Sequence, residues 1–72
     1  MDKDVALRKF GQRLAALRRQ KRLSVRELAA RSGLTGRQIE QIEAGKINLL
    51  FTTIVALARG LGVDPEELLE TL

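Results

Sequence analysis

The sequence contains no cysteine, histidine, tyrosine or tryptophan. The lack of cysteine excludes a disulfide framework and a thiolate metal site, so we expect neither a metal nor a cofactor. A chain without histidine, cysteine or tyrosine, and without a phosphate-binding glycine loop, is a poor candidate for an enzyme. With only two phenylalanines it also lacks the aromatic rings on which single-stranded nucleic acids stack.

Long apolar runs are missing as well, so no segment could span a bilayer. The first four residues, Met1-Asp2-Lys3-Asp4, lack the charged and apolar regions of a signal peptide, and we expect a cytoplasmic protein with no membrane partner. The 72 residues allow one domain, 1–72, with a thin core. A second copy of the chain could add buried surface to it.

The charge is divided unevenly along the chain. Residues 1–46 hold twelve of the thirteen Lys and Arg and five of the nine acids, a net charge of +7. Residues 47–72 hold one Arg and four acids, a net charge of −3. A basic face suggests a polyanion as partner, although Lys and Arg can equally keep a small helical protein soluble.

The aliphatic, Ala-rich composition favours helices over strands, and glycine and proline divide the chain into five short helical segments. These segments are expected from about Asp4 to Lys21, after Ser24, after Thr35, from about Thr52 to Arg59, and after Asp64. Residues 24–27 and 35–38 each fit a capping box, and residues 64–65 fit an N-cap followed by proline. The predicted fold class is an all-α, compact five-helix domain.

Residues 25–44, two of these segments and the turn between them, fit a helix-turn-helix. Gly33 in the turn suits a backbone with positive φ, and Ala29 is small enough for two helices to approach closely. The apolar contacts that fix the angle between the helices come from Leu28, Leu34, Ile39 and Ile42. Such a motif holds its second helix outward, so that its N-terminal end can enter the major groove of DNA.

Segments spread over nearly the whole chain carry a family resemblance. They are Phe10 to Leu14, Leu17-Arg18, Leu23 to Ala29, Ser32 to Thr35, Ile39 to Lys46, Thr53 to Val63 and Pro65 to Leu69. In this order and spacing they resemble the Cro/phage-repressor-like helix-turn-helix regulators, the xenobiotic-response-element family. The resemblance implies a lambda-repressor-like domain that usually binds operator DNA as a dimer. This family commonly has Gln where the present chain has Val25, and Arg26 or Ser24 could replace that contact.

The recognition helix is expected at about residues 35–44. Because Ile39 and Ile42 face the core, the helical period places Arg37, Gln41 and Ala44 on the outer face, with Gly36 and Glu40 beside it. Arg37 stands in the first turn, and its guanidinium can donate two hydrogen bonds to guanine O6 and N7. We predict that Arg37 is the main base-reading residue, the alternative being a grip on phosphate.

Polar and small residues around Arg37 complete the predicted DNA contacts. Thr35 is expected to cap the helix and could also meet a phosphate, while Gln38 and Gln41 can each meet a base or a phosphate. Gly36 either lets the backbone approach the DNA or only eases the turn. By the resemblance, Lys46 and Asn48 lie in a loop that touches the DNA backbone, although Asn48 could instead make a turn. The candidate DNA-binding residues are therefore Ser24, Val25, Arg26, Thr35, Gly36, Arg37, Gln38, Gln41, Lys46 and Asn48.

The resemblance also implies an ion pair. In the family an Arg of the first helix often pairs with a Glu near the end of the recognition helix, and Arg18 and Glu43 match those positions. We expect a partly buried pair that fixes the two helices together. The alternative is two independent surface charges.

The acidic half lacks a DNA-binding face, and its apolar residues are candidates for a dimer interface. The candidates are Leu49, Leu50, Val63, Leu69 and Leu72. Their alternative place is the core of the single chain. Phe51 is expected to complete that core while Leu49 or Leu50 stays outside.

These features predict a homodimeric transcriptional regulator that binds double-stranded DNA at a near-palindromic operator. No small-molecule ligand is evident. A protein-interaction module is the alternative, because helix-turn-helix folds can lose DNA binding. Three roles stay open: a stand-alone repressor, a restriction-modification controller and an antitoxin-like autoregulator.

Overall fold

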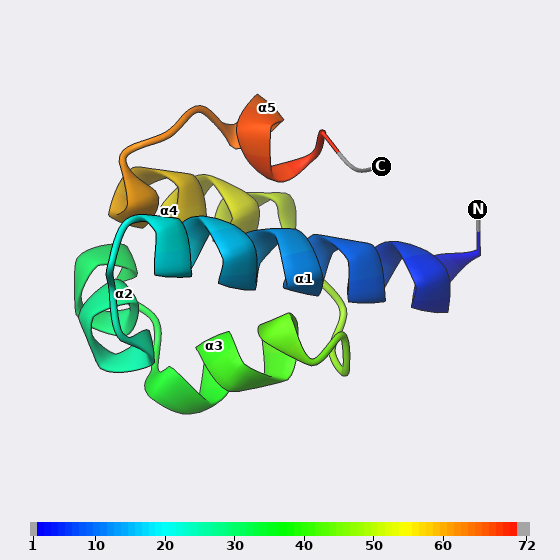
Figure 1. The fold of residues 1–72 in the computed structure, drawn as a ribbon. Helices are drawn as coiled ribbons and strands as arrows, with labels where there is room; N and C mark the ends of the chain where they lie inside the picture. The colour runs from blue at the N-terminus through cyan, green and yellow to red at the C-terminus, as the bar shows by residue number, and fades with distance from the viewer. Residues whose placement is uncertain (1, 71–72) are drawn as a thin grey trace.

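The computed structural model describes residues 2–70, which form five helices and no strand. The helices are α1 (Lys3–Gln20), α2 (Val25–Ser32), α3 (Gly36–Glu43), α4 (Phe51–Leu61) and α5 (Pro65–Leu68). The long helix α1 crosses the middle of the molecule, with α3 on one side and α4 and α5 on the other (Figure 1). The short helix α2 packs against both α3 and α4. The predicted all-α, five-helix fold is confirmed.

Reciprocal caps start the two helices of the motif. Ser24 Oγ accepts a hydrogen bond from the Glu27 N–H at 3.0 Å, and the Ser24 N–H donates to Glu27 Oε1 at 2.9 Å. Thr35 Oγ1 accepts from the Gln38 N–H at 3.1 Å, and the Thr35 N–H donates to Gln38 Oε1 at 2.8 Å. Both predicted capping boxes are confirmed. They satisfy N–H groups that the first turn of a helix leaves without partners.

The turns between helices rely on left-handed backbone positions. Gly33, which ends α2, has φ 76°, as the turn chemistry predicted. Arg22, between α1 and α2, also adopts a positive φ of 58°, without a glycine to mark it in the sequence. At α5, Asp64 holds the N-cap position before Pro65, but its side chain makes no capping hydrogen bond.

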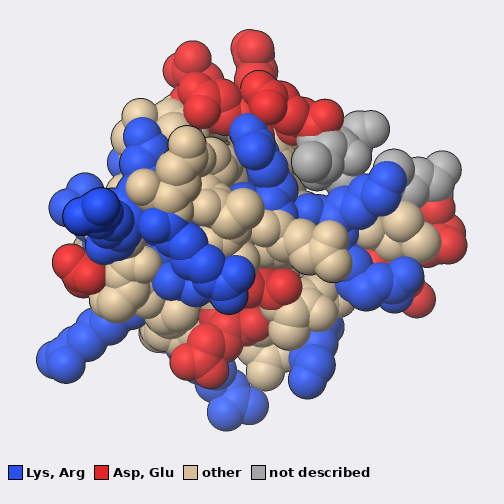
Figure 2. Space-filling model, in the orientation of Figure 1, with Lys and Arg blue, Asp and Glu red and all other residues tan. Residues whose placement is uncertain are grey.

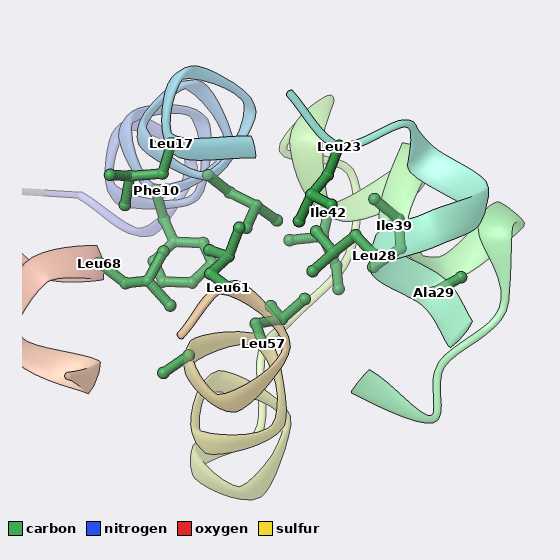
Figure 3. Packing of buried hydrophobic residues seen from close by; sticks show 12 residues of the cluster. Phe10, Leu17, Leu23, Leu28, Ala29, Ile39, Ile42, Leu57, Leu61 and Leu68 are labelled. Carbon is green, nitrogen blue, oxygen red and sulfur yellow. The ribbon is translucent and has the colours of Figure 1, made fainter. Parts of the chain in front are cut away.

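The core lies where all five helices meet, and Figure 3 shows its side chains converging from different parts of the chain. The largest fully buried side chains are Phe10, Leu14, Leu28, Ile39, Leu57 and Leu68. Leu28 of α2 and Ile39 of α3 are each 0% exposed, so the two motif helices are anchored in the same core as α1 and α4. No polar or charged residue is buried within the described part of the chain.

Phe51 does not complete this core, and that expectation is wrong. The residue is 72% exposed and Leu50 is 69% exposed, while Leu49 packs against the core. Phe51 is the first residue of α4, and helix side chains lean toward the N-terminus. The ring is therefore carried past the end of the helix. In the described residues, no helix is long and apolar enough to cross a membrane.

Candidate nucleic-acid interface

The helix α3 has one buried face and one exposed face. Ile39 is 0% exposed and Ile42 is 3% exposed, which fixes the rotation of the helix about its own axis. Arg37 and Glu40 are exposed on the other side, and Gln41 is half-buried. Arg37 and Glu40 are thus open to a partner, whereas Gln41, which the helical period places on the outer face, is only partly open.

The N-terminal ends of α2 and α3 lie together at one corner of the molecule (Figure 1). Ser24, Arg26 and Thr35 are exposed at this corner, and Val25 and Gly36 are half-buried. The positive end of each helix dipole lies here and favours an anion, although the capping boxes already occupy the N–H groups of Glu27 and Gln38. The corner therefore combines hydroxyls, a guanidinium and backbone donors, all of which can bind phosphate.

The capping boxes change what two of the candidate residues can offer. Gln38 uses Oε1 to accept the Thr35 N–H, so the amide group of its side chain is left to donate. The hydroxyl oxygen of Thr35 accepts from the Gln38 N–H, and its own proton can still reach a phosphate. Gln41 lies one turn further along the outer face, beyond the reach of the cap.

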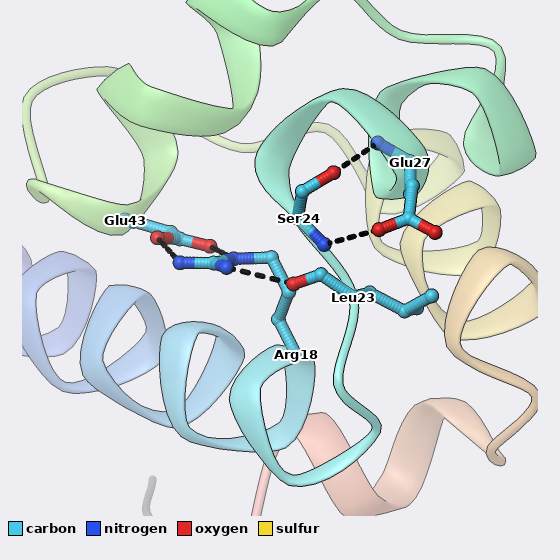
Figure 4. A network of polar contacts seen from close by, with 5 residues as sticks. All are labelled: Arg18, Leu23, Ser24, Glu27 and Glu43. Carbon is cyan, nitrogen blue, oxygen red and sulfur yellow. Dashed lines mark hydrogen bonds and ion pairs between the residues drawn. The ribbon is translucent and has the colours of Figure 1, made fainter.

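Arg18 and Glu43 form a bidentate ion pair (Figure 4). Arg18 Nε donates to Glu43 Oε2 at 2.7 Å, and a terminal guanidinium nitrogen donates to Oε1 at 3.1 Å. The other terminal nitrogen donates to the Leu23 carbonyl oxygen at 2.9 Å. The hydrogen bond with the Glu43 carboxylate raises the pKa of the Arg18 guanidinium above its ordinary value. One side chain thus joins α1, the turn before α2 and the last residue of α3.

A close backbone contact supports the same junction. A Cβ added to Gly11 would lie 2.5 Å from the carbonyl oxygens of both Ile42 and Glu43. Only a glycine lets α1 approach the end of α3 so closely. The ion pair and this contact together set the direction in which the N-terminal end of α3 points.

Lys46 and Asn48 lie in the loop after α3, and both are exposed. The Lys46 N–H donates to the Gln41 carbonyl oxygen at 3.0 Å, which holds the start of the loop against the end of the helix. The loop thus follows the opposite end of α3 from the capped corner. The exposed ammonium group of Lys46 is available to a partner that runs along α3.

The charges are unevenly distributed on the surface. The largest group of acidic side chains lies over α5 at the top of Figure 2, smaller acidic groups lie at the lower centre and at both sides, and Lys and Arg side chains spread over the rest of that view. The described acids of this end are Asp64, Glu66, Glu67 and Glu70. Helix α5 and α3 lie on opposite sides of α1, so the acidic end is turned away from the candidate interface (Figure 1).

The candidate dimer residues separate into two groups. Val63, Leu69 and Leu49 are half-buried and pack against the core of the chain itself. Leu50 is exposed, and Phe51, which the sequence reading assigned to the core, is exposed beside it. Leu72 lies outside the described residues. The amphipathic pattern of α4 could have flagged Phe51 only if its position at the helix start had been known.

A capped two-helix motif with an outward second helix, set in five helices around one core, defines a helix-turn-helix DNA-binding domain. Residues 9–72 match the family described as "Helix-turn-helix domain", and the chain belongs to that family. The relatives and solved structures that it resembles are named as regulators of transcription, not as enzymes. The fold is that of a DNA-binding transcriptional regulator, and the resemblance read from the sequence is confirmed.

Two curated relatives come from Sinorhizobium fredii. The chain is 40% identical over 58 residues to the uncharacterized HTH-type transcriptional regulator y4dJ, covering 81% of this chain and 75% of y4dJ. It is 43% identical over 53 residues to the uncharacterized HTH-type transcriptional regulator y4dL, covering 74% of this chain but only 27% of y4dL.

Solved structures share the fold. The restriction-modification controller protein C.AhdI from Aeromonas hydrophila has a TM-score of 0.87 and 42% identity, over 89% of this chain and 97% of that one. An HTH_3 family transcriptional regulator from Vibrio cholerae has a TM-score of 0.92 over 97% of this chain and 39% of that one. At 21% identity this second likeness concerns the fold alone.

Proposed function

We propose that this regulator binds a near-palindromic double-stranded DNA operator as a homodimer, with α3 in the major groove. The observation that carries the proposal is the exposure of Arg37 on the outer face of α3. That helix is held from behind by buried Ile39 and Ile42 and at its end by Glu43. A rigidly held helix places its first turn reproducibly, which is what reading base edges requires.

Arg37 is the proposed reader of sequence. It is in the first turn of α3, the part of a recognition helix that reaches base edges. Its fork can donate to O6 and N7 of guanine, a contact that discriminates by about 1–3 kcal/mol. Gln41, one turn later on the same face, can donate to and accept from adenine N7 and N6. These two side chains would supply most of the direct readout.

Phosphate contacts would flank this reading face on both sides. Ser24, Arg26 and Thr35 would hold one strand from the capped corner, with the amide of Gln38 beside them. Lys46 and Asn48 would hold the backbone beyond the end of α3. Neutralised phosphates release counterions, so the affinity should fall steeply as salt rises.

Exposed apolar side chains support the dimer. Leu50 and Phe51 are adjacent, and each exposes more than two thirds of its surface to water, at 69% and 72%. A second copy of the chain could cover them and add the buried area that a small domain lacks. A two-fold dimer would place its recognition helices about 34 Å apart, on two half-sites of an operator.

The experiment is selection of binding sites from random duplex DNA, followed by affinity measurements on single-base variants. Arg37→Ala should lose affinity for the selected site and lose its preference at one position in each half-site. Arg59→Ala removes the same charge from an exposed position on α4 and should leave that preference intact. An equal loss on every sequence would assign Arg37 to phosphate. Failure to enrich any duplex would refute DNA binding.

The likeness to C.AhdI favours one of the open roles. That protein is a restriction-modification controller, it is covered over 97% of its length, and it is 42% identical to this chain. We propose the role of a restriction-modification controller for this chain. Footprinting on the DNA that flanks its coding sequence, including the DNA upstream of any neighbouring restriction or methyltransferase gene, tests this role. A selected site that lies upstream of no such gene would contradict it.

A further inference from the structure

We propose that Val25 and Gly36 form an apolar notch that receives the C5 methyl group of a pyrimidine in the operator. Val25 is the first residue of α2, and Gly36 is the first residue of α3. A Cβ built on Gly36 would stand 3.7 Å from Val25 Cγ1, an ordinary van der Waals distance. The missing Cβ therefore leaves a space of methyl size directly beside a valine methyl. The inference rests on the proposed DNA binding and adds to it the chemistry of one contact.

The notch opens outward. Apart from the chain neighbours of Gly36 and the backbone of the first turn of α3, Val25 Cγ1 is the sole heavy atom within 4 Å of that Cβ position in the described residues. Val25 is half-buried and packs against the core, so its position is fixed from the inner side. Nothing in the packing requires Gly36, because its φ lies outside the positive range and an alanine would fit. The glycine thus leaves accessible an apolar surface that a larger residue would cover.

Polar residues surround the notch on both helices. Ser24 and Arg26 flank Val25, and Thr35 and Arg37 flank Gly36, all four of them exposed. A partner that satisfies these side chains with phosphates and base edges brings its groove directly over the notch. In the major groove of DNA the apolar group on the base edges is the C5 methyl of thymine. Cytosine methylated at C5 carries the same group at the same place.

The size of the effect follows from one methyl group. Burial of one methyl group away from water raises the affinity for DNA about four-fold. With one such contact in each half-site, each half-site contributes this factor once. A glutamine here would offer hydrogen bonds instead. Val25 and Gly36 therefore act on specificity, as Arg37 does, whereas the flanking Ser24, Arg26 and Thr35 act on affinity.

The experiment uses the full chain and a duplex selected from random DNA. Each thymine is replaced in turn by deoxyuridine, which removes only the C5 methyl, and each cytosine is replaced by 5-methylcytosine. The unmodified chain should lose about four-fold in affinity at one thymine per half-site, or gain as much at one methylated cytosine. A thymine response identifies thymine as the source of the methyl, and a cytosine response identifies 5-methylcytosine.

Two variants assign the response to the notch. Val25→Ala should abolish the discrimination between thymine and deoxyuridine, or between methylated and unmethylated cytosine. Gly36→Ala fills the space with its own methyl and should reverse the preference, so that the base without the methyl binds better. Because Gly36→Ala needs no rearrangement of the core, it keeps the test valid even if Val25→Ala destabilises the fold. Thermal melting checks both variants.

The outcomes separate this inference from the function beneath it. A chain that binds its selected duplex but responds to no methyl group refutes the notch and leaves DNA binding intact. A methyl response that is unchanged in Gly36→Ala refutes the notch as well. If no duplex can be selected, both the notch and the proposed DNA binding fail.

Discussion

Gly11 of α1 and Glu43 of α3 lie so close that a Cβ on the glycine would stand 2.5 Å from the Glu43 carbonyl oxygen. The clash is with backbone, which cannot rotate away as a side chain could. This contact explains why a long helix tolerates a glycine near its middle. It also connects the stability of the domain to the placement of the proposed recognition helix.

Gly11→Ala should therefore destabilise the fold although alanine is the better helix former. The gain in helix propensity is about 1 kcal/mol, whereas overpacking against a fixed backbone costs about 1–3 kcal/mol. Denaturant unfolding measures the difference. Gly36→Ala is the matched control, because its Cβ has only one contact at 3.7 Å, and it should be neutral or stabilising. An alanine at position 11 that unfolds at or above the wild-type midpoint would contradict the contact.

The ion pair between Arg18 and Glu43 should be worth more than an exposed pair. Its side chains are only 11% and 13% exposed, so either partner alone would be a poorly hydrated charge. We expect Glu43→Ala to destabilise the fold by about 2–3 kcal/mol and to weaken DNA binding further, because α3 loses its anchor. Arg18→Lys keeps the charge but not the fork, and it should recover part of the loss.

The exposed pair between Arg13 and Glu70 is the internal control. The charged atoms are 2.9 Å apart, but the Glu70 side chain is 60% exposed. Such pairs contribute about 0–1 kcal/mol, so Glu70→Ala should change the free energy of unfolding far less than Glu43→Ala. Equal losses in the two variants would show that the burial of the inner pair has no energetic consequence.

Much of the fold could be predicted because capping and turn residues mark in the sequence where the helices begin and end. Two capping boxes of four residues each indicate the starts of α2 and α3, one formed by Ser24 with Glu27 and the other by Thr35 with Gln38. Gly33 marks the turn between them because a glycine, having no Cβ, adopts a positive φ without steric cost. Where no such local signal exists the backbone conformation could not be predicted, as at Arg22, whose positive φ no neighbouring residue indicates.

Positions that depend on packing could not be read from the sequence. Phe51 fits the apolar stripe of its helix, but its place at the first turn carries the ring outward. Gly36 and Val25 are eleven positions apart, and only the angle between α2 and α3 brings them to contact distance. The sequence identified both as candidates for DNA contact. It could not show that they form one surface.

The two capping boxes should respond differently to acid. Hydrogen bonds from Ser24, first from its backbone N–H, lower the pKa of Glu27 below its ordinary value of 4.5. A carboxyl with a lowered pKa adds stability that is fully present above that ordinary value and is lost as the pH falls through the folded pKa. The equivalent residue of α3 is Gln38, which does not titrate.

Thermal melting from neutral pH to below the ordinary carboxyl value tests this difference. Glu27→Gln should make the melting temperature less sensitive to acid, because the cap no longer gains a proton. Gln38→Glu should make it more sensitive, since a second titrating cap is created. If Glu27→Gln and the unmodified chain lose stability in parallel, the acid sensitivity belongs to other carboxylates.

Replacing Leu50 and Phe51 together by serine should separate dimerisation from folding. At 69% and 72% exposure these side chains contribute little to the core, so the free energy of unfolding of the single chain should change by less than about 0.5 kcal/mol. If a second copy covers them, the dimer dissociation constant should rise at least about ten-fold, because each buried anchor is worth about 1 kcal/mol or more. Sedimentation with and without operator DNA measures the dimer, and half-site DNA measures what a single chain binds.

Leu49→Ser is the control: this neighbour packs against the core and should destabilise the fold instead. A serine variant that still dimerises like the wild type would place the interface elsewhere, and a wild type that stays monomeric on DNA would refute the dimer altogether.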